Sequence, residues 1–180
     1  LGSPAGLGSA AVWNVEGGLS GVAFGTAVAG AGDVDGDGYD DLLVGAPTFT
    51  NGQTEEGKAF LYSGASGGPS TISSWSSEGG VAGANFGAAV RGIGDVDGDG
   101  YEDVAVGAPG HDAGDGRVHV YSGSAGGLSS VATDLISGPD GGGFGSALAS
   151  GDVDGDGKAD LAIGAPDADG DDAETGVVYL

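Results

Sequence analysis

The chain has 180 residues, a mass of 16.9 kDa and a formal charge of −23, because 27 acidic residues are balanced by only four basic ones. This charge argues against nucleic acid or an anionic membrane surface as a partner, and no apolar run is long enough to insert across a bilayer. Cysteine is absent, which excludes a disulfide scaffold and thiol chemistry.

The first predicted element is a short strand over residues 11–16, Ala-Val-Trp-Asn-Val-Glu, which precedes a motif that occurs three times. Each copy reads Phe-Gly, then an acidic nonapeptide, then Gly-Ala-Pro, and the copies run from Phe24 to Pro47, from Phe86 to Pro109 and from Phe144 to Pro166. Spacings of 62 and 58 residues indicate stacked supersecondary units that cannot stand alone. We therefore divide the single domain 1–180 into an N-terminal outer strand, 1–17, and three repeats, 18–79, 80–137 and 138–180.

Four short strands are predicted in each repeat. The first is built from Gly and Ala with one Phe, which suits close packing at a crowded axis, and covers residues 22–31, 84–93 and 142–150. The second is apolar and ends at the Pro, at residues 42–47, 104–109 and 161–166. The third alternates like a half-buried strand, at residues 58–64, 117–123 and 176–180. The fourth is a polar outer strand, at residues 69–78 and 128–137, and the third repeat lacks it.

The acidic nonapeptide, Asp-x-Asp-Gly-Asp-Gly-x-x-Asp, predicts a calcium loop, since this hard cation takes six to eight oxygen ligands and a tight turn can present alternate residues to it. Glycine at the even positions permits the positive φ that such a curl requires. The predicted ligands of the three Ca²⁺ sites are four carboxylates and one backbone carbonyl each: Asp33, Asp35, Asp37, Asp41 and the Tyr39 carbonyl; Asp95, Asp97, Asp99, Asp103 and the Tyr101 carbonyl; Asp152, Asp154, Asp156, Asp160 and the Lys158 carbonyl. Neighbouring carboxylates repel by about 1 to 4 kcal/mol per pair, so calcium binding and folding should be coupled.

Three other classes of acidic loop fit less well. A dockerin loop leads into a helix, whereas residues 161–166, Leu-Ala-Ile-Gly-Ala-Pro, have neither helical length nor helical period. Thrombospondin-type repeats carry cysteines, and an EF-hand needs a Glu at its twelfth position and flanking helices. Residues 167–172 offer a fourth, weaker cation site, but without a following apolar strand.

The three copies resemble FG-GAP repeats, the units of the integrin α-subunit β-propeller. The resemblance rests on the Phe-Gly pairs, on the acidic nonapeptides, and on Gly-Ala-Pro at residues 45–47, 107–109 and 164–166, and it covers nearly the whole chain. It implies an all-β fold of four-stranded antiparallel propeller blades, one blade per repeat. It also implies calcium in the hairpin between the first two strands and ligand contact on the opposite face. Propellers of the family normally have seven blades, whereas this chain has three.

Three blades are too few to close a ring, since about four is the smallest number usually seen. The strand at 11–16 can supply the outer strand that the third repeat lacks, which is a velcro closure of the last blade. Two chains joined head to tail through these ends would form a homodimer with a six-bladed ring. The alternative is that the chain is a fragment of a longer propeller.

Recognition is predicted on the loops that face away from the metal sites, because these loops differ most between the repeats. They comprise residues 48–57, 110–116 and 167–175, and residues 17–23, 79–85 and 138–143. Trp13 and Trp75 occupy the same place in their repeats and are interpreted as covers of blade edges, with sugar stacking as the alternative. His119, between two valines, is interpreted as a packed strand residue.

These features together predict a non-enzymatic, calcium-stabilised module for extracellular recognition, with adhesion to a protein as its leading use. A carbohydrate-binding lectin, a non-catalytic appendage of a secreted enzyme and an engineered repeat scaffold are the alternatives, so the ligand is a protein or a glycan. An extracellular or cell-surface location is expected because short open loops need roughly 10⁻⁴ to 10⁻³ M calcium.

Overall fold

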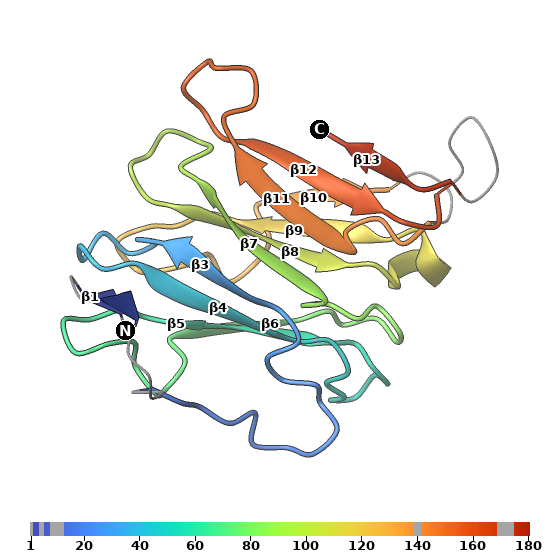
Figure 1. Cartoon of the computed structure of the whole chain (residues 1–180). Helices are drawn as coiled ribbons and strands as arrows, with labels where there is room; N and C mark the ends of the chain where they lie inside the picture. Colours follow the sequence, from blue (N-terminus) through green and yellow to red (C-terminus); the bar gives the residue numbers. More distant parts are fainter. Residues whose placement is uncertain (1, 4–5, 8–12, 139–141, 169–174) are drawn as a thin grey trace.

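The structure, a computed structural model, describes residues 2–3, 6–7, 13–138, 142–168 and 175–180. Over these residues the elements are β-strands and one 3₁₀ turn, His111–Gly114. Apart from a small N-terminal hairpin, the strands form three antiparallel sheets that stack on one another in chain order (Figure 1). We call these sheets blades 1, 2 and 3. Within the described ranges, no helix has the length and apolarity needed to cross a membrane.

The strands follow each other across each sheet in the order of the sequence. Blade 1 contains β3 (Val28–Gly32), β4 (Asp41–Ala46), β5 (Lys58–Tyr62) and β6 (Trp75–Glu78). Blade 2 contains β7 (Ala89–Gly94), β8 (Asp103–Ala108), β9 (Arg117–Tyr121) and β10 (Asp134–Ser137). Blade 3 contains β11 (Ala147–Gly151), β12 (Asp160–Ala165) and β13 (Val177–Tyr179), and the N-terminal hairpin contains β1 (Gly2–Ser3) and β2 (Gly6–Leu7). The predicted all-β class and antiparallel four-stranded blades are confirmed in blades 1 and 2.

The predicted boundaries of the first and fourth strands are wrong. The first strands were expected to include the Phe-Gly pairs, but each begins three or four residues after its Phe. Phe86 instead lies in a turn, because Asn85 has a φ of 52° and its carbonyl accepts a hydrogen bond from the Ala88 N–H at 3.0 Å. The fourth strands cover only the last four residues of their predicted ranges. Of the strand predicted at 11–16, residues 13–16 lie outside any sheet of the described chain, and residues 11–12 lie outside the described residues.

An apolar layer fills the space between each pair of neighbouring blades. Leu43 and Leu61 of blade 1 pack with Phe86 and Val104 of blade 2 in one cluster, and all four side chains are almost fully buried. A second cluster joins blades 2 and 3 and contains Val118, Val120, Phe144 and Ile163. Full burial of such a side chain contributes roughly 1.5 to 3 kcal/mol. The blades therefore stabilise each other through their faces.

Two glycines of the motif allow neighbouring blades to approach closely. A Cβ atom on Gly45 would lie 1.9 Å from the carbonyl oxygen of Gly87, and one on Gly107 would lie 2.0 Å from that of Gly145. Backbone therefore meets backbone where the Gly-Ala-Pro of one blade touches the Phe-Gly of the next. This contact explains why both halves of the motif contain glycine.

The third strand of each blade carries an aromatic ring that packs edge-on against the Phe of its own repeat. Phe60 packs against Phe24, His119 against Phe86 and Tyr179 against Phe144, with ring centroids 5.5, 5.0 and 5.4 Å apart. His119 thus occupies a position that holds a neutral ring in the other two blades. Burial, which is the largest cause, and the nearby His111 and Arg117 together lower the pKa of His119 from 6.5 to about 4.

Replacement of His119 by Phe should remove part of the acid sensitivity of the fold. The unfolded chain binds a proton on His119 near pH 6.5, whereas the folded chain does so only near pH 4. The neutral ring therefore contributes stability that is present above pH 6.5 and is lost as the pH falls from 6.5 to 4. We expect His119→Phe to raise the free energy of unfolding at pH 4.5 by about 2 kcal/mol more than at pH 7.5, allowing for screening of the partly exposed ring.

Urea unfolding at the two pH values measures this difference. The reciprocal change, Phe60→His, should introduce the same pH dependence into blade 1. An equal change in the unfolding free energy of His119→Phe at pH 4.5 and 7.5 would contradict the lowered pKa of His119.

Candidate metal centres

Backbone N–H groups hold each acidic nonapeptide in a tight turn. In the loop between β3 and β4, the Asp33 carboxylate accepts hydrogen bonds from the N–H groups of Gly36, Asp37 and Gly38 at 2.8, 3.0 and 2.9 Å. Gly36 and Gly38 have φ of 75° and 91°, a conformation that favours glycine. Asp95 accepts the corresponding three hydrogen bonds in the loop between β7 and β8. The N–H dipoles offset part of the repulsion between the carboxylates.

Three carboxylates converge in each loop, with one oxygen of each lying within 4.8 Å of the others. The converging groups are Asp33, Asp35 and Asp37 in the first loop, Asp95, Asp97 and Asp99 in the second, and Asp152, Asp154 and Asp160 in the third. A cluster made only of oxygen donors, without nitrogen or sulfur, suits Ca²⁺ better than a transition metal. The residues present therefore fit the predicted cation.

The last Asp of the nonapeptide has a different environment in the first two loops. Asp41 is buried, and its carboxylate oxygens accept the N–H groups of Val34 at 3.2 Å and Gly64 at 2.8 Å. Asp103 is also buried and makes the same pair of bonds, to Val96 and Gly123, both at 2.9 Å. Burial raises the pKa of both carboxyl groups, against the effect of these hydrogen bonds. Each of these residues ties its loop to the end of the third strand of its own blade.

Asp160, the corresponding residue of the third loop, is only partly buried and belongs to the converging group. Its carboxylate accepts the Val153 N–H at 2.8 Å. The third loop therefore brings together a different set of three than the first two loops, because Asp160 takes the place of Asp156.

The backbone carbonyls of Tyr39, Tyr101 and Lys158 remain predicted ligands. The N–H group of each residue donates to the preceding Asp side chain, at 2.9, 3.0 and 2.8 Å respectively. These bonds fix the backbone at the seventh position of every loop in the same way. Whether the carbonyls bind a cation stays a prediction.

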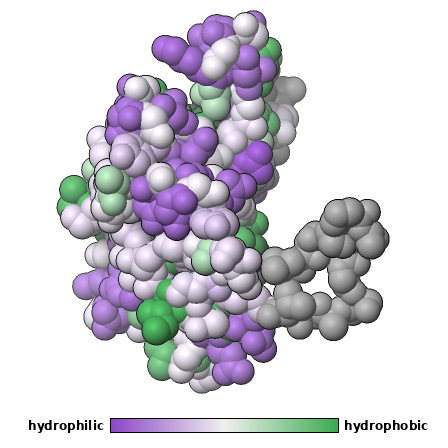
Figure 2. Space-filling view, turned by 90° about the vertical axis from the view of Figure 1, so that its left-hand side faces the viewer, coloured by the Kyte–Doolittle hydropathy of each residue, from purple (hydrophilic) through white to green (hydrophobic). Residues whose placement is uncertain are grey.

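The loops lie together at one end of the sheets, where Figure 1 shows the β3–β4, β7–β8 and β11–β12 connections on the same side. The Glu102 N–H donates to the Asp33 carbonyl at 3.3 Å and thereby links the second loop to the first. Figure 2 views this end, and hydrophilic residues gather over it from blade 3 to blade 1. The three Asp clusters therefore lie at the same end of the molecule.

Glu102 was not among the predicted site residues. Its side chain is partly buried against the backbone of Gly32, so that a Cβ there would lie 2.6 Å from its Cγ. Burial raises the pKa of the Glu102 carboxyl, and the charges of Asp95, Asp103, Asp40 and Asp33 raise it further. The sequence offers little signal for this placement, because the residue at the same position is Asp40 in the first loop and Ala159 in the third.

The far end of the blades, where recognition was predicted, is held by polar contacts. Glu56 is buried and accepts the Asn51 N–H at 2.7 Å. In the corresponding loop of blade 2, the Arg117 guanidinium contacts the Asp112 carboxylate at 3.0 Å and the ring of buried His111 at 3.2 Å. Of the six predicted loops, residues 139–141 and 169–174 lie outside the described residues, and so does most of the weaker cation site predicted at 167–172.

Both tryptophans are engaged in contacts between successive segments of the chain. The Trp75 indole N–H donates to the Ser129 carbonyl at 2.9 Å, and its ring packs edge-on against Tyr121 of blade 2. Trp13 makes the equivalent contacts with Ser70 and Tyr62 of blade 1, at 3.1 Å for the hydrogen bond. These contacts favour the interpretation that the tryptophans cover blade edges over the alternative that they stack on sugars.

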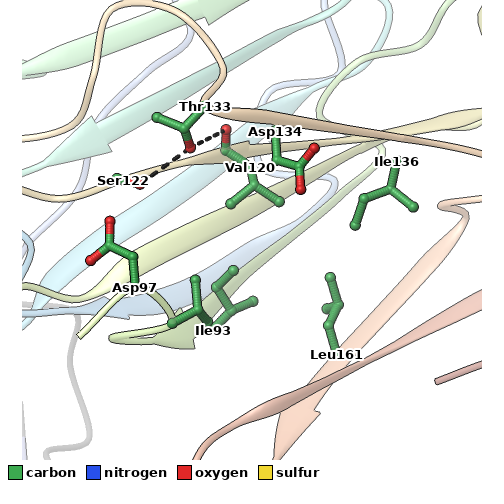
Figure 3. Close-up of a pocket in the computed structure, with 9 residues that line it drawn as sticks. Ile93, Asp97, Val120, Ser122, Thr133, Asp134, Ile136 and Leu161 are labelled. Atoms are coloured by element: carbon green, nitrogen blue, oxygen red, sulfur yellow. Dashed lines mark hydrogen bonds between the residues drawn. The ribbon is translucent and has the colours of Figure 1, made fainter. Parts of the chain in front are cut away.

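A hollow of about 390 Å³ opens between blades 2 and 3. Figure 3 shows Ile93, Val120, Ile136 and Leu161 around it, with Asp134 at its edge. Cross-strand pairing places Asp134 opposite Val120, as Trp75 lies opposite Leu61 in blade 1. The hollow thus lies where blade 2 has the small side chain of Asp134 and blade 1 has the bulky indole of Trp75.

The FG-GAP repeat family model matches residues 24–62, 86–121 and 144–180, which together exceed half of the chain. Among similar proteins, integrin alpha-PS2 of Drosophila melanogaster is 40% identical over 175 residues, integrin alpha-4 of Xenopus laevis 38% over 148, and integrin alpha-IIb of Homo sapiens 38% over 156. These alignments cover 88%, 79% and 79% of this chain, but only 12%, 14% and 14% of the relatives. The chain therefore spans a small part of the length of these relatives.

Two aspartates of the second loop should differ in how their loss affects stability. Asp103→Ala leaves one buried and one partly buried N–H group without a partner, which should cost about 1 to 3 kcal/mol of unfolding free energy even in the presence of a calcium chelator. Asp97→Ala removes an exposed converging carboxylate, so its cost should be small in chelator and larger in calcium.

Urea unfolding of both variants with EGTA and with 5 mM CaCl₂ separates these roles. Asp134→Ala is the matched control, because it removes an exposed acid outside the loops. A large decrease in the unfolding free energy of Asp97→Ala in EGTA would contradict the different roles given to Asp97 and Asp103.

Proposed function

Because the chain belongs to the FG-GAP repeat family, we propose that it is a non-catalytic recognition module whose propeller blades are stabilised by calcium and which adheres to a protein partner. The main observation in support is that three carboxylates converge in each of three loops, and that these loops lie at one end of the molecule. The similarity to integrin alpha chains supports adhesion as the use of the module. An extracellular location is part of this proposal, since loops of this kind need calcium at about 10⁻⁴ to 10⁻³ M.

The residues that would hold calcium are those predicted from the nonapeptides. In the first two loops, Asp33 and Asp95 hold the turn through N–H donors, and their neighbours at the third and fifth positions complete the converging carboxylates. The bound ion would neutralise charge that otherwise opposes packing of neighbouring loops. Three ions would reduce the formal charge of the chain from −23 to −17.

Partner binding is assigned to the end of the blades away from the acidic loops. The loops there differ in sequence between repeats, while polar contacts such as Arg117–Asp112 and Asn51–Glu78 hold them on the scaffold. A recognition loop fixed in this manner loses less conformational entropy on binding.

Calcium titration by isothermal calorimetry tests the metal part of the proposal. We expect three binding events per chain and a rise in the thermal midpoint that magnesium does not reproduce, because magnesium demands stricter octahedral geometry. For each site, calcium at 100 times its dissociation constant should add about 2.7 kcal/mol to the unfolding free energy. Asp97→Asn should remove one event, whereas Asp134→Asn should remove none. Equal stabilisation by magnesium and calcium would contradict the assignment.

Adhesion is tested by presenting the immobilised chain to a panel of purified secreted and cell-surface proteins, in parallel with a glycan array. We expect calcium-dependent capture of a protein that is weakened when Asp112 is replaced by Ala and unchanged by Asp134→Ala. Capture of glycans that is lost in Trp75→Phe would instead support the lectin alternative.

A further inference from the structure

The N-terminal segment Trp13–Gly17 crosses blade 1 along the path that the outer strand of blade 1 takes across blade 2. Trp13 corresponds to Trp75 in its hydrogen bond and in its aromatic contact, as described above. Gly17 corresponds to Gly79, because a Cβ on either would collide with the Phe of the following repeat, at 2.5 and 2.8 Å from its Cβ. The segment is therefore positioned as the outer strand of a blade that would precede blade 1.

The segment also has the exposure pattern of a strand. Trp13 and Val15 are partly buried against blade 1, whereas Asn14 and Glu16 between them are exposed. This alternation matches an extended segment with one face on a neighbouring blade. Residues 13–16 nevertheless pair with no strand among the described residues.

Blade 3 presents a complementary open surface. Val178 in β13 is 74% exposed, whereas the corresponding residues, Ala59 of blade 1 and Val118 of blade 2, are 0% exposed under the next blade. A shallow groove of about 210 Å³ marks this face, and it is lined by Ala147, Leu148, Ala149, Ala162, Gly164 and Val178. At its outer edge, β13 pairs with β12 on one side only within the described chain.

Blade 1 carries the surface that would fit against this face. In blade 2, Val90 lies under blade 1 and is 7% exposed, but Val28 at the same position in blade 1 is 58% exposed. The open faces of blades 3 and 1 are thus equivalent to the two faces that meet between blades 1 and 2, and again between blades 2 and 3. One chain cannot bring them together, because two blade interfaces already separate them.

We propose that the open face of blade 3 receives blade 1 of a second copy of this chain, whose residues 13–16 add to β13 as the missing fourth strand. The register of β5 with β6 in blade 1, carried over to blade 3, pairs Leu180 with Trp13 of the second copy and Val178 with Val15 of the second copy. Two such contacts related by a two-fold axis close a ring of six blades, within the range of known propellers.

Matching surfaces support a second copy as the occupant. Among the described residues, each copy carries both an extended segment without a partner strand, residues 13–16, and a β13 edge without a fourth strand. The exposed valines at both faces supply the apolar contact that the other blade interfaces use.

The mass of the 180-residue chain in solution tests the proposal. Sedimentation equilibrium in 5 mM CaCl₂ and 150 mM NaCl should give twice the chain mass of 16.9 kDa, at concentrations from 1 to 100 μM. Val178→Asp should weaken self-association at least about tenfold, since it buries an unpaired charge in the contact. Val131→Asp is the matched control, because Val131 is 72% exposed and lies outside the proposed contact.

Cysteine pairing tests the register, and the 180-residue chain contains no cysteine that would interfere. Val15→Cys and Val178→Cys chains, mixed and oxidised, should form a disulfide-linked dimer, whereas either variant mixed with Val131→Cys should not. Because Val178 is exposed and Val15 is only partly buried, circular dichroism should show all variants folded.

A wild-type chain that stays monomeric at 100 μM would overturn the proposal, as would a monomer that binds further repeats of another protein but not itself. A mass that grows without limit with concentration would overturn the closed ring. Disulfide formation that does not depend on which cysteine pair is mixed would overturn the register.

Discussion

The structure depends on one constraint: each blade can bury its apolar faces only against the blades next to it. Among the described residues no helix covers these sheets, so Leu43 and Leu61 are buried against residues of blade 2 such as Phe86 and Val104. The approach is close because glycine meets glycine where Gly45 touches Gly87. Stability is therefore shared between repeats rather than contained in each. The two faces at the ends of the stack are left exposed by the same rule.

At one end of this stack, the aspartates of each acidic loop have different environments. In the first two loops, the first Asp accepts several N–H groups and shapes the turn, and one of its oxygens converges with those of the Asp residues at the third and fifth positions. In blades 1 and 2 the last Asp, as in Asp41 and Asp103, ties the loop to the end of the third strand. A metal ion placed in such a loop would therefore act on the packing of the sheet and not on an isolated turn. Glu102 extends this coupling between blades.

Much of the fold was predictable because it repeats. Motif spacing gave the number of blades, and apolar runs placed β4, β8 and β12 within one residue, since a short apolar run that follows a turn and ends at a Pro favours a buried strand over a helix. The starts of β3, β7 and β11 were not predictable, because a Gly-Ala segment fits both a strand and a turn and Asn85 adopts a positive φ that its residue type only permits. In the candidate metal centres, the convergence of three carboxylates in each loop was predictable from their spacing. The burial of Asp103 and the position of Glu102 depend on contacts between distant segments, which spacing alone does not reveal.

Blade 2 has Asp134 at the position that Trp75 occupies in blade 1, and this difference has a dynamic consequence. The Trp75 indole covers the edge of the interface between blades 1 and 2, whereas the interface between blades 2 and 3 has an acid and a hollow there. Local opening requires the least free energy where few apolar contacts must be broken. Blade 3 should therefore separate from the stack before blades 1 and 2 part, and its amide protons should exchange with solvent through partial unfolding well below the global transition.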